Sequence, residues 1–435
     1  MKTLIKNINI LTVDENSNQY QSGCILIDGH EITFVGYERD LGVAAGTDID
    51  IVEDGRGMLA IPGLVNSHTH TAMTLFRGYA NDLPLMKWLE EKIWPAEDRL
   101  AQDDVYWLSL LAISEMIKGG VTAFADMYMF MEQTALSVLH SGIRGVLARG
   151  LQGPDQKSRD RLEENRILWE NWHGEGDGRI RVMVGPHGVY TCEPSYLAEV
   201  LELAHSLGTG IHIHLSETRQ EVENCIKEYG KSPVMHLNDL GLLGGNTLAA
   251  HCVHLSSEDL DVLKDRDVKI VHCPISNLKL GSGIAPVHEM LSKGIAVSLG
   301  TDGAASNNNL SIMKEMAFAA LISKGVKEDA TLISAATALK MATNHGAGAL
   351  GLEDEIGSIS PGKKADIVLV DTGEPHYHPH GDWTTHLVYS GHSGDVDSVW
   401  VNGKRLMKNK ALLTIDSDKV YSKVRSIYKR VMGSR

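Results

Sequence analysis

Residues 59–71 read Leu-Ala-Ile-Pro-Gly-Leu-Val-Asn-Ser-His-Thr-His-Thr, a short apolar run that ends in two histidines one residue apart. Side chains at positions i and i+2 of an extended strand point to the same face, so the imidazoles of His68 and His70 can converge on one point. Because imidazole is the commonest metal ligand, this spacing suggests a metal site. The chain contains 20 histidines, however, so such a pair also arises by chance and the prediction depends on its context.

Apolar strand segments alternate with helical segments along the middle of the chain. The strand that ends at His68 and His70 is followed by seven further candidates, at 121–127, 144–151, 180–184, 210–215, 247–253, 268–272 and 295–299. This alternation predicts eight parallel strands joined by right-handed crossovers, which is an α/β fold of the (β/α)8 TIM-barrel type. A doubly wound open sheet is the alternative, but no glycine-rich phosphate fingerprint opens any of the units.

The two ends of the chain show a different pattern of polar and apolar residues. The first 58 residues alternate polar and apolar side chains in short segments, and residues 396–401 followed by Asn402-Gly403 indicate a hairpin. We expect the two ends to form one small β-sandwich domain, and residues 416–432 to form an amphipathic terminal helix. The expected division is 1–58 and 357–435 for the small domain and 59–356 for the metal-dependent catalytic barrel.

Composition limits the kinds of partner. A formal net charge of −15 argues against nucleic acid and against an anionic membrane surface, because both require a basic face. The five cysteines are scattered and form no C-x-x-C pair, which is typical of free thiols in a reducing compartment. The first ten residues alternate rather than forming a signal peptide's apolar core. We therefore expect a cytoplasmic protein that acts on a small molecule. We also expect the chain to form a homo-oligomer.

Residues able to do chemistry follow the apolar strands at their carboxyl ends, where barrel enzymes gather their functional groups. They are His68 and His70 after the first strand, Arg149 at the end of the third, His187 after the fourth, His212, His214 and Glu217 at the fifth, His251 after the sixth and Asp302 after the eighth. His68, His70, His214 and Asp302 form a coherent ligand set for a divalent ion, with a position left for water. Zinc suits these ligands best, whereas ligand type alone leaves iron, nickel and manganese open. His212 and His272 also fit as core histidines.

Six segments carry a resemblance that covers nearly the whole chain. They read PGLVNSHTH, IHIHLSET, AHCVH, SNLKLGSG, GTDGAASNN and PGKKADI, in this order. Together they resemble the amidohydrolase superfamily, and most closely the 5'-methylthioadenosine/S-adenosylhomocysteine deaminase family. His187 stands at the end of the fourth strand, where a binuclear site would need a bridging lysine, so a mononuclear site is expected.

The resemblance implies one divalent metal ion per subunit, bound by His68, His70, His214 and Asp302. Glu217, His251 and Asp302 would be the catalytic residues. Asp302 would take a proton from the attacking water and His251 would orient that water. Glu217 would protonate ring N1 of the adenine as water attacks C6, and would then pass a proton to the departing ammonia.

The resemblance also implies a set of substrate contacts. Beside Glu217 and Asp302, the set contains Trp88, Glu97, Arg149, Arg161, His187 and Ser306. Glu97 would accept hydrogen bonds from ribose hydroxyls, and the two arginines would hold the amino-acid carboxylate of S-adenosylhomocysteine, for which guanidinium is well suited. Plain alternatives stay open: Trp88 as helix core, Glu97 as a helix N-terminal carboxylate, His187 as a buried strand-end residue and Arg161 as a surface residue.

The expected activity is hydrolytic deamination of the adenine ring of 5'-methylthioadenosine, S-adenosylhomocysteine or adenosine. It would give the inosine analogue and ammonia, with a nucleoside as the small-molecule partner. The alternative with the same fold is a deaminase or chlorohydrolase that acts on guanine, cytosine or an s-triazine. A non-catalytic relative would have lost a metal ligand, and none is missing. A cytidine-deaminase architecture is disfavoured because His173-Gly174-Glu175 is followed by no Pro-Cys-x-x-Cys.

Overall fold

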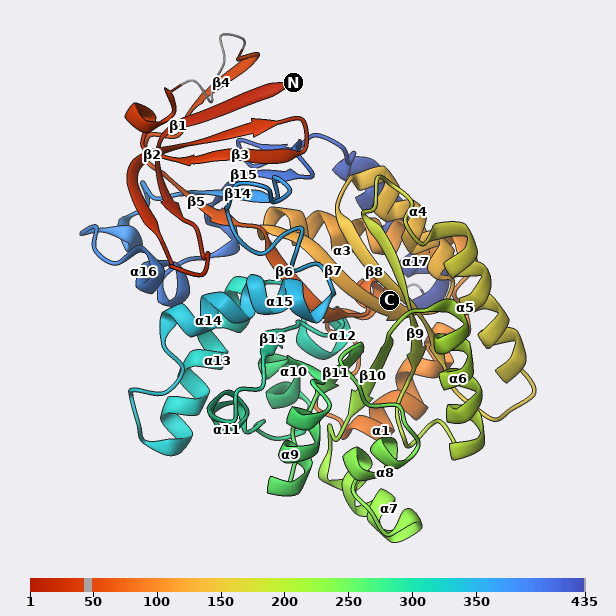
Figure 1. The fold of residues 1–435 in the computed structure, drawn as a ribbon. Helices are drawn as coiled ribbons and strands as arrows, with labels where there is room; N and C mark the ends of the chain where they lie inside the picture. The colour runs from red at the N-terminus through yellow and green to blue at the C-terminus, as the bar shows by residue number, and fades with distance from the viewer. Residues whose placement is uncertain (43–48, 434–435) are drawn as a thin grey trace.

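The computed structural model describes residues 1–42 and 49–433, which build two sheets. Figure 1 shows a barrel of parallel strands surrounded by helices, and a second sheet beside it that combines the red N-terminal strands with blue C-terminal ones. The expected architecture, a TIM-type barrel with a separate β unit made by both chain ends, is confirmed.

The barrel consists of eight strands that pair in parallel with their neighbours in sequence order. They are β6 (Leu64–Thr69), β7 (Val121–Tyr128), β8 (Arg144–Leu151), β9 (Ile180–Pro186), β10 (Ile211–Leu215), β11 (Thr247–His251), β12 (Lys269–His272) and β13 (Val297–Leu299). Every residue of β6, β7, β10, β11 and β13 is buried, as expected for strands covered on both faces. All eight coincide with the strand segments expected from the sequence.

Helices follow the strands, and the longer ones cover the outside of the barrel (Figure 1). They are α3 (Gln102–Lys118), α4 (Met131–Ser141), α5 (Ser158–Trp172), α6 (Pro194–Leu207), α7 (Arg219–Tyr229), α8 (Pro233–Asp239), α9 (Ser257–Asp265), α10 (Pro274–Lys279), α11 (Val287–Ser292), α12 (Ala304–Asn307), α13 (Ile312–Lys327), α14 (Ala335–Ala342) and α15 (Asn344–Ala349). Before α3, the chain crosses the strand ends as α1 (Leu85–Trp88), a π-helical turn (Leu89–Ile93) and α2 (Trp94–Glu97). These short pieces form a wall above the barrel.

The first and last barrel strands meet through side chains as well as backbone. The Asn66 side chain accepts a hydrogen bond from the Thr301 backbone N–H at 2.9 Å and donates one to the Thr301 hydroxyl at 2.8 Å. The Asp302 N–H donates to the carbonyl of His68 at 3.0 Å, and the Thr69 hydroxyl donates to the carbonyl of Asp302 at 3.0 Å. These bonds, which we call the β6–β13 seam, fix the end of β13 against the end of β6.

The second sheet has nine strands. They are β1 (Lys2–Leu11), β2 (Gln19–Asp28), β3 (Glu31–Gly36), β4 (Ile51–Asp54), β5 (Met58–Pro62), β14 (Ile367–Asp371), β15 (Val396–Val401), β16 (Lys404–Lys408) and β17 (Ala411–Leu412). Strand β5 lies between β1 and β14, so it joins the two ends of the chain into one continuous sheet. Its apolar core includes Ile5, Ile25, Ile367 and Trp400.

The apolar run at residues 59–65 is therefore two strands rather than one. Its first part belongs to β5 of the small sheet, and the barrel begins at Leu64. Gly63 lies between them, and a Cβ at this position would lie 2.0 Å from the Thr122 hydroxyl oxygen. Only glycine fits this close approach, so Gly63 permits the chain to pass directly from one sheet to the other.

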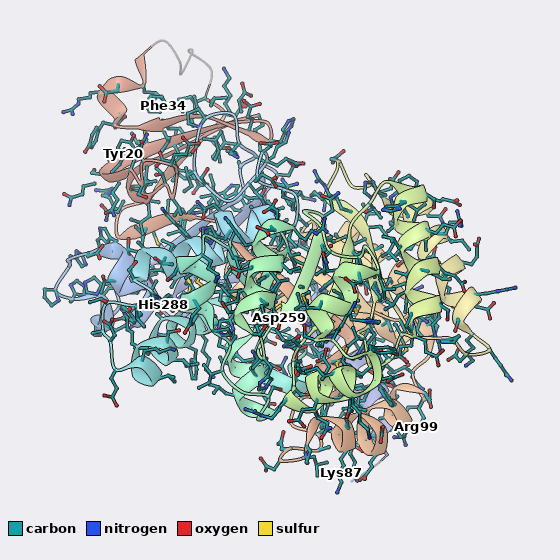
Figure 2. The ribbon with its side chains drawn as sticks, turned by 60° about the horizontal axis from the view of Figure 1, so that its bottom comes forward. Tyr20, Phe34, Lys87, Arg99, Asp259 and His288 are labelled. Carbon is teal, nitrogen blue, oxygen red and sulfur yellow. The ribbon has the colours of Figure 1, made fainter. Side chains whose placement is uncertain are left out.

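The chain ends in α17 (Ser417–Met432), which packs against the barrel helix α3 rather than on the small sheet. Arg430 of α17 forms an ion pair with Asp104 of α3. Figure 2 shows Tyr20 and Phe34 of the small sheet at one end of the molecule and Lys87 and Arg99 at the other. Within the described residues, no helix combines the length and apolar character that crossing a membrane requires.

Candidate active site

Histidines from two strands converge at the carboxyl end of the barrel. His68 and His70 come from the end of β6 and His214 from β10, and their ligand atoms lie within 4.8 Å of one another. The Nε2 atoms of His70 and His214 are 3.3 Å apart. Asp302, which follows β13, places its Oδ1 3.2 Å from His70 Nε2 and 3.5 Å from His68 Nε2. The structure thus gathers the four expected metal ligands around one point.

Hydrogen bonds to the far ring nitrogens orient these imidazoles. His70 Nδ1 donates to the carbonyl of Met127 at 2.6 Å, and His214 Nδ1 donates to the carbonyl of His187 at 2.7 Å. His251, at the end of β11, holds its Nδ1 2.9 Å from the Asn277 side-chain oxygen. A proton fixed on Nδ1 leaves Nε2 as an acceptor, so three Nε2 lone pairs face the common centre.

His212 has a role that the sequence did not reveal. Its Nε2 lies 2.8 Å from Nδ1 of His68, and burial lowers the pKa of His212 well below its usual value, which keeps the ring neutral. His212 therefore orients His68 as the carbonyls orient His70 and His214. The available signal was the alternation of His212 and His214 in β10, which puts both rings on the inner face of the strand.

Asp302 is held rigidly by its own set of partners. Its Oδ2 accepts hydrogen bonds from the hydroxyls of Ser276 and Ser306, both at 2.6 Å, and its Oδ1 accepts one from the Gly303 N–H at 2.7 Å. Its backbone adopts φ +60°, a left-handed conformation that its surroundings must stabilise. Burial favours the neutral acid, but the imidazoles of His68 and His70, whose Nε2 atoms lie 3.5 Å and 3.2 Å from Oδ1, hold the pKa of Asp302 well below its usual range. The carboxylate is ionised.

The donor set fits a divalent metal ion. Among the described residues, Nε2 of His68 is buried without a hydrogen-bond partner, and an unsatisfied buried acceptor is costly. A cation at the centre would satisfy this atom and the Nε2 atoms of His70 and His214, and it would neutralise the charge of Asp302. Three imidazoles and one carboxylate are a ligand set that zinc and related ions accept.

Glu217 lies beside this centre, three residues beyond His214. Its Oε2 is 3.9 Å from His251 Nε2, and its Oε1 accepts a hydrogen bond from the Ser282 hydroxyl at 3.2 Å. Burial raises the pKa of Glu217, which favours the protonated acid. The buried carboxylate of Glu221 accepts the backbone N–H of Glu217 at 2.7 Å and so fixes the turn that carries it. Glu217 can therefore act as a proton donor next to the four candidate ligands.

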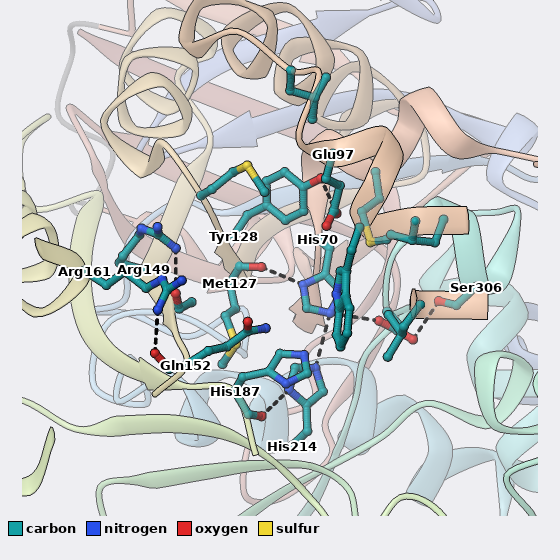
Figure 3. A pocket seen from close by; sticks show the side chains of 18 of the residues that line it. His70, Glu97, Met127, Tyr128, Arg149, Gln152, Arg161, His187, His214 and Ser306 are labelled. Carbon is teal, nitrogen blue, oxygen red and sulfur yellow. Dashed lines mark hydrogen bonds and ion pairs between the residues drawn. The ribbon is translucent and has the colours of Figure 1, made fainter. Parts of the chain in front are cut away.

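A cavity of about 740 Å³ opens above the four candidate ligands (Figure 3). Its lining contains the predicted contacts Trp88, Glu97, Arg149, Arg161, His187, Glu217, Asp302 and Ser306, together with His70, His214 and His251. Glu97 accepts a 2.5 Å hydrogen bond from the hydroxyl of Tyr128, and burial raises the pKa of Glu97. The Ser306 hydroxyl donates to Asp302 at the base of the cavity, so it supports the carboxylate.

Arg149 and Arg161 lie together at the side of the cavity, and both are partly engaged already. Arg149 donates from Nε to Glu164 at 2.5 Å and from Nη1 to the carbonyl of Gly150 at 2.6 Å. Arg161 donates from Nη1 to the carbonyl of Gln152 at 2.7 Å, and to Asp155 at 2.9 Å. In both guanidinium groups, Nη2 takes part in none of the hydrogen bonds formed among the described residues. These nitrogens remain available to an anionic group in the cavity.

Two further histidines lie at strand ends. His187 lines the cavity, its Nδ1 is 3.0 Å from the Thr191 hydroxyl, and burial lowers the pKa of His187 to about 3, so the ring is neutral. His272 is buried at the end of β12, is not part of the cavity lining, and its pKa is likewise lowered by burial to about 3. This position agrees with the interpretation of His272 as a core residue.

Comparison with known proteins extends these observations. The amidohydrolase family model matches residues 59–406. A 5-methylthioadenosine/S-adenosylhomocysteine deaminase from Caldanaerobacter subterraneus subsp. tengcongensis is 50% identical over 426 residues, which cover 98% of this chain and 97% of that protein. One from Moorella thermoacetica is 50% identical over 423 residues, which cover 97% and 98%.

Solved structures show the same architecture. An adenosine deaminase from Xanthomonas campestris with bound zinc superposes with a TM-score of 0.95 at 32% identity, over 99% of each chain. An atrazine chlorohydrolase from Arthrobacter aurescens TC1 in complex with zinc gives a TM-score of 0.90 at 25% identity, over 98% of this chain and 100% of that one.

Proposed function

The chain belongs to the amidohydrolase family, and from this membership we propose that it is a metal-dependent deaminase of 5'-methylthioadenosine and S-adenosylhomocysteine. It hydrolyses the C6–amino bond of the adenine ring and releases the inosine analogue and ammonia. The observation that carries the proposal is the convergence of His68, His70, His214 and Asp302 beneath Glu217, at the base of a cavity large enough for a nucleoside. The 50% sequence identity to deaminases of these two nucleosides, which extends over nearly the whole chain, supports the choice of substrate.

We assign one divalent ion per chain to His68, His70, His214 and Asp302. The bound zinc in two structural relatives favours zinc as its identity. When bound, such an ion supplies Lewis acidity that lowers the pKa of a water molecule towards ~7, so that a nucleophile is available at neutral pH. The buried, unpartnered Nε2 of His68 is the feature of this chain that supports the assignment most directly.

Asp302 and His251 flank the position from which water reaches the substrate. Oδ1 of Asp302 is the oxygen that faces the histidines, while Oδ2 is occupied by two serine hydroxyls. Oδ1 therefore accepts the proton of the attacking water. His251 has its Nδ1 held by Asn277, so its Nε2 points to the same space and orients the water.

Glu217 supplies the proton that the purine needs. Its Oε1 accepts from Ser282, which leaves Oε2 to carry the acidic proton. Proton transfer to ring N1 makes C6 electrophilic as the water oxygen forms its bond to that carbon. Asp302 then passes the proton that it took from water to the amino group, the C6–nitrogen bond breaks, and ammonia leaves. The proton of the C6 hydroxyl returns to Glu217, which gives the C6 carbonyl of the inosine analogue and restores the acid.

The rest of the cavity selects the nucleoside. Glu97, fixed by the Tyr128 hydroxyl, accepts hydrogen bonds from the ribose hydroxyls, and His187 and Trp88 border the base. The free Nη2 atoms of Arg149 and Arg161 bind the carboxylate at the end of S-adenosylhomocysteine. A bare purine or triazine offers none of these groups, so the cavity favours nucleosides that carry a 5' substituent.

A substrate panel tests this proposal. Ammonia release is measured from 5'-methylthioadenosine, S-adenosylhomocysteine, adenosine, guanine and cytosine, and chloride release from a chlorinated s-triazine, with the metal content determined on the same sample. We expect the two 5'-thio nucleosides to give the highest kcat/KM. A preference for guanine, cytosine or the triazine would replace this function with the alternative hydrolase activity.

A further inference from the structure

A second group of potential metal ligands lies outside the active site, in the segment that connects β14 to β15. This segment contains five histidines, His376, His378, His380, His386 and His392. It includes the 3-10 turn η5 (Pro375–Tyr377), the helix α16 (Trp383–Tyr389) and the 3-10 turn η6 (Ser393–Asp395). Helix α16 packs against α13 and α14 on the outside of the barrel, near the small sheet (Figure 1).

Three side chains of this segment meet where its two ends approach each other. His376 Nε2 lies 2.9 Å from Asp395 Oδ2, and His392 Nδ1 lies 3.6 Å from the same oxygen. All three ligand atoms lie within 4.8 Å of one another. Asp395 is buried, His376 is partly buried and the side chain of His392 is exposed, so the group has a buried carboxylate at its base and an open side towards solvent.

Hydrogen bonds from its own turn and from the protein core position the carboxylate of Asp395. Asp395 Oδ2 accepts the backbone N–H of His392 at 2.7 Å and the hydroxyl of Tyr377 at 3.2 Å. Tyr377 is fully buried, so the oxygen is anchored to the core of the protein. The two imidazoles lie with ring centroids 4.8 Å apart and planes at 87°, so they do not stack and their nitrogens can approach one ion from different directions.

These separations suit a small divalent cation. In a tetrahedral zinc site with bonds of about 2.0–2.1 Å, the ligand atoms lie about 3.3–3.4 Å apart. The observed nitrogen–oxygen distances of 2.9 Å and 3.6 Å fall on either side of this value, and the two imidazole nitrogens lie within 4.8 Å of each other, so side-chain rotations can bring the three atoms around one ion. Two imidazoles and one carboxylate are ligands for first-row transition ions rather than for Ca²⁺ or Mg²⁺, which prefer oxygen.

We propose that His376, His392 and Asp395 form a second metal site, which binds a divalent first-row transition ion such as Zn²⁺ and leaves its remaining position to water. Binding replaces the Nε2 proton of His376, which passes to solvent, and joins η5 to η6 across the whole intervening segment. The site is structural: it closes the loop that holds α16 on the barrel. It uses none of the active-site ligands and does not depend on the proposed reaction.

Metal binding to the full-length protein tests this site. The chain is loaded with one equivalent of Zn²⁺ and then dialysed against low-micromolar free Zn²⁺, and bound zinc per chain is measured by elemental analysis. We expect a second equivalent in the unmodified protein and its loss in His392→Ala, whose exposed side chain can be removed without disturbing the core. Proteolysis of the 376–395 segment should slow by several-fold on addition of Zn²⁺ in the unmodified protein only.

His378→Ala is the matched control, because this exposed histidine belongs to the same segment but lies outside the group. It should retain the second equivalent and the protection from proteolysis. The proposal is overturned if the unmodified protein binds only one equivalent, or if His378→Ala loses zinc as His392→Ala does. Deaminase activity should be unchanged in both variants, so failure of this site is distinguishable from failure of the proposed reaction.

Discussion

The base and the side of the cavity are built in different ways. The base consists of His68, His70, His214 and Asp302, which are carried by strands or by the residues directly after them, and each has its outer atoms fixed by hydrogen bonds. The side consists of Arg149 and Arg161, whose guanidinium groups form ion pairs with the half-exposed carboxylates of Glu164 and Asp155. The base is thus preorganised for chemistry, whereas the side can exchange an internal partner for a substrate.

Removal of a ligand at the base should have the largest effect. We expect His68→Ala or Asp302→Ala to abolish metal binding and deamination together, because either change leaves too few ligands to hold the ion. Elemental analysis and kcat on the same preparations check this. His205→Ala, on the exposed surface of α6, is the control and should behave as the unmodified protein. Full activity in a metal-free ligand variant would contradict the preorganised base.

Glu217→Gln should separate proton transfer from metal binding. The variant keeps the size of the side chain but loses the acid, so kcat should fall by about 10²–10⁴-fold while the metal content is retained. Burial raises the pKa of Glu217, so this side chain is protonated at a higher pH than an exposed glutamate. The unmodified enzyme should lose activity when the pH rises above this raised pKa, because the acid is then deprotonated. A variant with normal kcat would remove Glu217 from the mechanism.

Arg149→Ala should affect the side of the cavity alone. For S-adenosylhomocysteine, kcat/KM should fall by about one to two orders of magnitude, since hydrogen bonds to a charged group contribute about 1.5–3 kcal/mol. For 5'-methylthioadenosine, which has no carboxylate, the loss should be much smaller. Arg159→Ala on the exposed face of α5 serves as the control. An equal loss of kcat/KM for both substrates would mean that Arg149 stabilises the structure and does not bind the carboxylate of S-adenosylhomocysteine.

Substitution of Glu315, which lies behind the base, should have the smallest effect on deamination and should instead change how stability depends on pH. It accepts hydrogen bonds from Asn307 at 2.7 Å and from the Ile275 N–H at 3.2 Å, and burial raises the pKa of Glu315 from 4.5 to about 8. The folded chain therefore binds this proton more tightly than the unfolded chain, so stability decreases as the pH rises from about 5 to 8. Glu315→Gln should flatten this dependence of the melting temperature, and an unchanged slope would argue against a protonated Glu315.

Much of the fold and the central cluster could be predicted from local patterns. The eight barrel strands were recognisable because each is an apolar run, and parallel strands bring the residues at their carboxyl ends to one face. This rule was sufficient to gather His68, His70, His214 and Asp302. It works because the relevant distances depend on strand topology rather than on individual side-chain contacts.

The supporting contacts could not be predicted in this way. His212, Asn277 and Glu221 act through hydrogen bonds to atoms that lie far away in sequence or on a turn, and no spacing identifies such partners. The assignment of β5 to the small sheet could not be predicted for a similar reason. Its apolar residues continue directly into β6, and only the pairing of β5 with β1 and β14 assigns them to the other sheet.

The β6–β13 seam has a consequence for synthesis of the protein. His68 and His70 leave the ribosome early, but Asp302 and the partners that close the seam come more than two hundred residues later. A partly synthesised chain that lacks β13 cannot present all four ligands. If these residues hold the proposed ion, the complete ligand set forms only after β13 has docked against β6, so metal occupancy reports a closed barrel.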